Sequence, residues 1–136
     1  MIGALFVSLA LVVFGSDNLV VAVMIPLQWR LVLTLCVLAP LLEELVFRGL
    51  IQGYFRQHTQ AKKTFVGISA ANLLTSLLFV LMHWLTRDGY TAALVFLPSV
   101  YLGVVRDRIG SLLTCMFIHV FWNFTWYLTL WLSQAL

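Results

Sequence analysis

The sequence is a succession of long apolar runs separated by short polar or basic gaps, and this pattern most restricts how the chain can fold. Of its 136 residues 62% are hydrophobic and only 10% are charged. A soluble domain is usually about half apolar and about a quarter charged. So few charges cannot cover a surface in water, so we expect the surplus apolar surface to face a lipid bilayer.

The apolar runs have the length of membrane helices. A span needs roughly 17–25 mostly apolar residues. Lipid permits only helices or closed barrels, and runs this long are too apolar for barrel strands. No strand alternation appears. The predicted fold class is therefore all-α, a polytopic transmembrane helix bundle with about five membrane helices. The expected helices cover 1–14, 29–56, 65–85, 90–105 and 111–132.

We expect a single membrane domain over residues 1–136, formed by an N-terminal hydrophobic segment, 1–28, and a core, 29–133. The run at 1–14 has no basic residue before it, and Gly15–Asn18 is not a clear cleavage site. We therefore interpret the run as a first, short or truncated span, with a cleaved secretory signal as the alternative.

The net charge of +3 is carried by basic residues in the gaps between the runs. Arg56, Lys62 and Lys63 lie in one gap, and Arg106 and Arg108 lie in another. The positive-inside rule places these gaps, and with them the N-terminus, on the cytoplasmic side. No basic stripe is interleaved with aromatic residues, so nucleic acid is not an expected partner.

The chain's only two glutamates, Glu43 and Glu44, are neighbours inside an apolar run. Ionisable groups within membrane spans are energetically expensive and by default indicate function. Arg48 follows Glu44 by four residues, a spacing that places the two on one helix face, where they can pair. Glu43 points about 100° away and lacks that partner. The alternative is a structural ion pair that holds helices together.

Two further apolar runs contain His83 and His119, and Asn123 shares a helix face with His119. Three helices therefore each carry a polar face. Such faces are cheapest in lipid when they converge on a common wet cavity. Each histidine or asparagine taken alone can instead be an interhelical hydrogen bond.

This set of side chains is sufficient for hydrolysis. A carboxylate in an apolar cavity can act as a general base or acid, and a histidine can share its water. Histidine and asparagine donors can stabilise an oxyanion. No serine, threonine or cysteine has a base at motif spacing, so we expect water to be the nucleophile.

Three motifs carry a resemblance to a known family. Glu43–Gly49 resembles the EExxxR motif of the CPBP membrane proteases, Phe79–His83 their FxxxH motif and His119–Asn123 their HxxxN motif. That family includes the type II CAAX prenyl endopeptidases and bacterial bacteriocin-processing and self-immunity relatives. The resemblance, which covers roughly 29–126, implies a glutamate-dependent intramembrane endopeptidase acting on a membrane-anchored peptide or protein. We expect it in the inner membrane of a prokaryotic cell.

The resemblance also implies a role for each motif residue. Glu43 would activate water with help from His83, and His119 with Asn123 would form the oxyanion site. The remaining two residues of the set, Glu44 and Arg48, would position the catalytic glutamate or the substrate.

The resemblance implies catalysis without a cofactor. Two histidines and two glutamates can in principle ligate zinc, but the sequence has no HExxH motif, and Arg48 brings a positive charge beside the glutamates. A zinc-dependent protease with the same residues is one alternative. A catalytically silent immunity or scaffold protein is another, and a proton-coupled transporter is a third.

Overall fold

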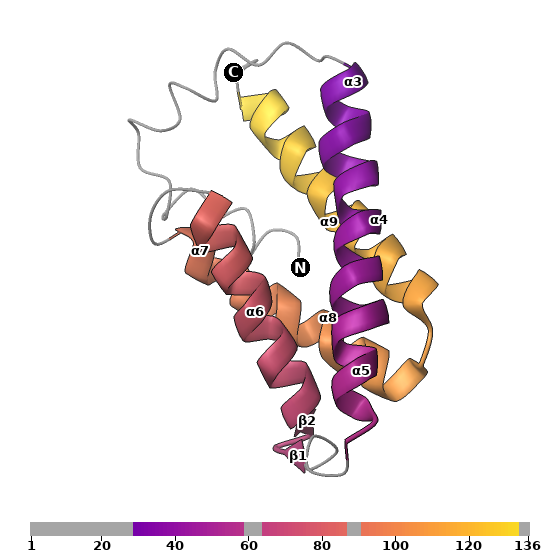
Figure 1. Cartoon of the computed structure of the whole chain (residues 1–136). Helices are drawn as coiled ribbons and strands as arrows, with labels where there is room; N and C mark the ends of the chain where they lie inside the picture. The colour runs from indigo at the N-terminus through magenta and orange to yellow at the C-terminus, as the bar shows by residue number, and fades with distance from the viewer. Residues whose placement is uncertain (1–28, 59–63, 87–90, 134–136) are drawn as a thin grey trace. The chain divides into compact units, whose positions relative to one another are not determined.

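The computed structural model describes residues 29–58, 64–86 and 91–133 (Figure 1). The predicted span at 1–14 lies outside these residues. The chain divides into two compact units, Met1–Pro40 with Val120–Leu136 and Leu41–His119. Each unit is described by itself. The division into an N-terminal segment, 1–28, and a core, 29–133, stays a prediction.

The predicted helix at 29–56 is confirmed as an unbroken succession of helical elements. These are α3 (Trp29–Val32), η1 (Leu33–Leu38), α4 (Ala39–Glu44), η2 (Leu45–Ile51) and α5 (Gln52–Arg56). The elements η1 and η2 are π-helical, since the amide of Ala39 donates to Thr34 and that of Gln52 donates to Phe47, five residues back. Such wider turns occur often at functional sites.

A small hairpin precedes the next helix and corrects the expectation of no strand. Strands β1 (Thr64–Phe65) and β2 (Ile68–Ser69) are antiparallel. The two turn residues, Val66 and Gly67, have φ of 52° and 78°, a backbone that suits a two-residue hairpin. The hairpin occupies residues that the sequence assigned to a helix at 65–85, so α6 (Ala70–Thr86) begins later than expected. Ser69 caps this helix by accepting a hydrogen bond from the amide of Asn72 at 3.0 Å.

Of the last two predicted helices, the second matches the structure better than the first. The run at 90–105 is divided into α7 (Thr91–Leu94) and α8 (Phe96–Ile109). Helix α8 continues four residues further than expected and ends at Gly110, whose φ of 76° is typical of a helix C-cap. The predicted helix at 111–132 is confirmed as α9 (Leu112–Ser133).

Helices α6 and α8 lie side by side in the second unit (Figure 1). Their close approach depends on Gly103, because a Cβ atom there would lie 1.9 Å from the Oδ1 atom of Asn72. The Asn72 amide crosses the same contact and donates to the Val100 carbonyl at 2.9 Å. Small residues at such a contact let two helix backbones come close enough for direct hydrogen bonds.

The second unit buries many polar side chains beside its apolar core and exposes many large apolar ones. Its fully buried side chains include Glu44, Arg48, Gln52, Asn72 and Ser99. Large apolar side chains are exposed on every long helix of this unit, among them Leu50, Leu77, Leu85, Leu97, Leu113 and Phe117. Soluble proteins show the opposite preference, with charged residues almost never fully buried unless they are paired.

The predicted helical class is confirmed, because nearly all of the described residues are helical. In the part of the chain that it describes, the structure does not show the expected membrane passes, about five in number, as single long helices. Over 29–58, 64–86 and 91–133, no one helix combines the length and the hydropathy that a bilayer crossing requires. Two of the expected runs are divided into shorter elements, 29–56 by two π-helical stretches and 90–105 at Val95.

Candidate active site

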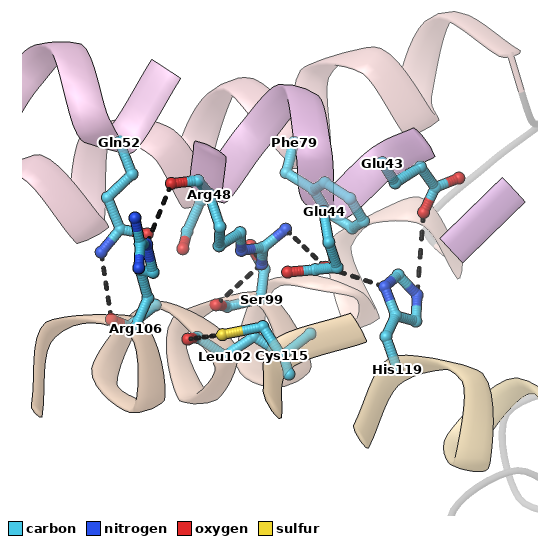
Figure 2. A network of polar contacts seen from close by, with 12 residues as sticks. Glu43, Glu44, Arg48, Gln52, Phe79, Ser99, Leu102, Arg106, Cys115 and His119 are labelled. Atoms are coloured by element: carbon cyan, nitrogen blue, oxygen red, sulfur yellow. Dashed lines mark hydrogen bonds and ion pairs between the residues drawn. The ribbon is translucent and has the colours of Figure 1, made fainter. Parts of the chain in front are cut away.

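Glu44 and Arg48 form the predicted ion pair at the centre of the second unit (Figure 2). The Oε1 atom of Glu44 lies 3.1 Å from Nη1 of Arg48, and both side chains are completely buried. The guanidinium also lies over the ring of Phe79, with Cζ 4.9 Å from the ring centroid, a favourable cation–π arrangement. A buried pair of this kind leaves neither charge uncompensated.

His119 joins the same carboxylate from helix α9. Its Nδ1 atom lies 2.8 Å from Oε1 of Glu44, and since an ionised carboxylate can only accept, Nδ1 donates. Its Nε2 atom lies 3.7 Å from Oε2 of Glu43, too far for a hydrogen bond. The imidazole therefore lies between the two glutamates (Figure 2).

The two neighbouring glutamates have different surroundings. The Glu44 side chain is completely buried, whereas 21% of the Glu43 side chain is exposed. Glu44 is occupied by Arg48 and His119 through Oε1, and its Oε2 atom has no hydrogen-bond partner among the described residues. Of the two glutamates, only Glu43 has a side chain that is both partly exposed and beside His119.

His83 is placed near this group by the aromatic ring of Phe79. The two rings have centroids 4.4 Å apart, and the Phe79 ring is also 6.3 Å from that of His119. The Nδ1 atom of His83 lies 3.0 Å from the Phe79 carbonyl. Because a carbonyl can only accept, Nδ1 donates in this contact.

Asn123 belongs to the first unit. Its Nδ2 atom donates to the Leu35 carbonyl at 3.0 Å, and its backbone carbonyl accepts from Sγ of Cys36 at 3.6 Å. Its expected part in an oxyanion site stays a prediction.

A second set of polar contacts, which sequence reasoning missed, continues behind Arg48. We call Arg48, Gln52, Ser99 and Asp107 the polar ladder. Nη2 of Arg48 donates to the Ser99 carbonyl at 3.0 Å and to its Oγ at 2.8 Å. Nε2 of Gln52 donates to the Gly103 carbonyl at 3.0 Å and to Oδ1 of Asp107 at 2.9 Å. The signal was helical spacing, because Gln52 follows Arg48 by four residues and Asp107 follows Ser99 by eight, which continues the spacing of Glu44 and Arg48.

Asp107 ends the ladder and joins three segments of the unit. Its Oδ1 atom lies 3.5 Å from Nε of Arg56 on α5. Its Oδ2 atom accepts from Oγ of Ser69, at the start of α6, at 2.6 Å. The carboxylate therefore connects the ends of α5 and β2 to α8, next to the hairpin.

The described side chains do not favour a metal centre. Within these ranges, no group of three His, Cys, Asp or Glu side chains is arranged to hold a metal ion. Arg48 and His119 occupy one oxygen of Glu44. The zinc alternative therefore gains no support from the geometry of this part of the chain.

The arrangement is suited to moving protons. Glu43 offers a partly exposed carboxylate, His83 an imidazole near the group, and His119 an imidazole held by a buried acid. Carboxylates and imidazoles are the usual general bases and acids of hydrolytic enzymes. The buried ion pair of Arg48 and Glu44 lies beside these side chains and is inaccessible to water.

Comparison with known proteins identifies the family. The family model described as type II CAAX prenyl endopeptidase Rce1-like matches residues 25–125, which include all three motifs. A protein of Escherichia coli described as an uncharacterized 24.3 kDa protein is 38% identical over 88 residues, which are 65% of this chain and 38% of that protein. The chain thus spans well under half of that relative's length. No solved structure matches. Because the family model covers most of the chain, the resemblance inferred from the motifs is confirmed, and the chain belongs to the Rce1-like family of type II CAAX prenyl endopeptidases.

Proposed function

We propose that this chain is an intramembrane endopeptidase that hydrolyses a peptide bond of a membrane-anchored peptide or protein. The family is one of peptidases. The observation that carries the finer proposal is the difference between the two glutamates. Glu44 is enclosed by Arg48 and His119, while Glu43 is partly exposed beside the same histidine. A general base for water must be reachable by water, so the base is Glu43.

In the proposed reaction, Glu43 removes a proton from a water molecule whose oxygen attacks the carbonyl carbon of the substrate. His83 helps Glu43 to activate this water. The carbonyl oxygen becomes an oxyanion. Collapse of the tetrahedral intermediate breaks the C–N bond, and Glu43 returns its proton to the leaving amine.

We assign the oxyanion to His119 and Asn123. His119 already donates from Nδ1 to Glu44, so it can donate from Nε2 only when the ring carries both protons. The carboxylates of Glu43 and Glu44 flank the ring and would stabilise this imidazolium. An imidazolium donor stabilises developing negative charge more strongly than a neutral donor.

We place the protein in a membrane, with residues 29–56, 65–85, 90–105 and 111–132 among the expected passes and the basic gaps that follow 29–56 and 90–105 on the cytoplasmic side. The burial pattern supports a lipid environment: charged and amide side chains are buried in the second unit, while many of its leucines are exposed. This distribution fits lipid as the surrounding medium, where polar groups must be satisfied internally. The similarity to a protein of Escherichia coli supports a prokaryotic inner membrane.

The test is a cleavage assay in proteoliposomes. Wild type and Glu43→Gln are incubated with a library of membrane-anchored peptides, half of them prenylated, and the products are read by mass spectrometry with and without a chelator. We expect cleavage by wild type that Glu43→Gln loses and that the chelator leaves unchanged. Loss of activity with chelator and recovery with zinc would favour the zinc-dependent alternative. No cleavage by a folded wild-type protein would favour an immunity or scaffold role.

A further inference from the structure

Ser99 lies outside all three motifs, yet it is the main anchor of Arg48. The Nη2 atom of Arg48 donates to both the carbonyl and the Oγ atom of Ser99. The Nε atom of Arg48 is buried without a hydrogen-bond partner among the described residues, and Nη1 faces Glu44. Besides the ring of Phe79 over which it lies, the buried guanidinium is therefore held by an ion pair with Glu44 and by hydrogen bonds to Ser99.

Only one of these two contacts can orient Arg48 relative to other helices. Glu44 and Arg48 lie four residues apart in one helical run, so their pair moves with that run. Ser99 belongs to α8, 51 residues further along the chain, and is 1% exposed. The same Glu44 oxygen that meets Arg48 also accepts from Nδ1 of His119. A continuous chain of contacts thus runs from Ser99 through Arg48 and Glu44 to His119 (Figure 2).

We propose that Ser99 is a positioning residue, which holds the Arg48 guanidinium so that Glu44 presents Oε1 to His119. Ser99 does not touch the accessible carboxylate of Glu43 and acts only through Arg48. This inference rests on the proposed function for its kinetic consequences. Its structural consequence, the hydrogen bond that Nδ1 of His119 donates to Glu44, does not depend on that function.

Ser76 provides a matched control. It is also 1% exposed, and its hydroxyl makes one side-chain hydrogen bond, to Oδ1 of Asn72 at 3.1 Å. Ser76→Ala and Ser99→Ala therefore remove the same group from equally buried sites. Only Ser99 is connected to Arg48.

The kinetic arm compares wild type, Ser99→Ala, Ser99→Thr and Ser76→Ala. We expect Ser99→Ala to lower kcat roughly tenfold or more, because hydrogen bonds to charged groups are stronger than neutral ones. KM should change by less than about twofold, since ground-state binding is untouched. Ser99→Thr, which keeps the hydroxyl, should recover most of the rate, and Ser76→Ala should match wild type. In an Arg48→Lys background, Ser99→Ala should have no further effect, because the shared path is already broken.

The second arm records the ¹⁵N imidazole signals of the histidines by NMR in detergent. We expect Nδ1 of His119 to shift in Ser99→Ala and to stay in place in Ser76→Ala. If the wild type cleaves nothing, the proposed function fails and this arm still tests the positioning role. If Ser99→Ala matches Ser76→Ala in both arms, or lowers the rate only in proportion to lost folded protein, the positioning role is refuted.

Discussion

The Oε1 atom of Glu44 lies 2.8 Å from Nδ1 of His119 and 3.1 Å from Nη1 of Arg48. One buried oxygen thus connects a cation in its own helical run to an imidazole on α9. The neighbouring glutamate, Glu43, is left accessible. The two carboxylates are thus divided between a structural role for Glu44 and a chemical role for Glu43.

Glu44 and Arg48 should depend on each other for stability. Removing either charge alone, as in Glu44→Gln or Arg48→Met, leaves a buried unpaired charge and should lower the free energy of unfolding by about 3–5 kcal/mol. The double variant removes both charges and should lose less than the sum of the single losses. Unfolding in mild detergent, followed by circular dichroism, measures these differences. Additive losses would show that the pair does not stabilise the interior.

Gly103 should tolerate no side chain. In Gly103→Ala the new Cβ would lie 1.9 Å from Oδ1 of Asn72, so α6 and α8 must move apart, at about 1–3 kcal/mol. Gly53→Ala is the matched control, because a Cβ there meets no atom within 4 Å. That variant should be neutral or more stable by up to about 1 kcal/mol, since alanine favours a helix. Equal effects of the two substitutions would contradict the close contact.

Asp107 should need both of its carboxylate oxygens. It accepts from Gln52 through one oxygen and from Ser69 through the other. Asp107→Asn replaces one acceptor with a donor and should cost about 1–3 kcal/mol of stability. Arg108→Gln next to it removes an exposed charge and should change stability by at most about 0.5 kcal/mol. An Asp107→Asn protein as stable as Arg108→Gln would rule out this end of the polar ladder.

Phe79 should matter more to activity than its size suggests. Its ring faces the Arg48 guanidinium and packs beside His83 and His119. Phe79→Leu keeps an apolar side chain but loses these aromatic contacts, so we expect about 1–2 kcal/mol less stability. We also expect roughly a tenfold to hundredfold lower kcat/KM from misplaced imidazoles. Phe117→Leu, at a 73% exposed position, should leave both quantities unchanged in the same assays.

The sequence predicts the local relationships of the site well. The spacing of four residues correctly pairs Glu44 with Arg48 and leaves Glu43 without that partner. The expectation that polar faces converge is met for the glutamates and His119. These predictions succeed because helical periodicity and the expense of burying charge act wherever the helices pack.

Contacts between distant segments could not be predicted. Ser99 and Asp107 are ordinary polar residues in the sequence, and only the packing of α8 brings them to Arg48 and Gln52. The hairpin turn places Val66, a β-branched residue, at positive φ, which local preferences argue against. The π-helical turns and the break at Val95 were likewise not predicted.

The most direct test of the central claim compares activity with stability in Glu43→Gln. Because the Glu43 side chain is partly exposed, the substitution should change the free energy of unfolding by at most about 0.5 kcal/mol. Loss of the general base should lower kcat/KM about 10²- to 10⁴-fold. We predict a variant that melts like wild type and cleaves almost nothing. A Glu43→Gln protein that keeps wild-type kcat/KM would contradict the assignment of Glu43 as the base.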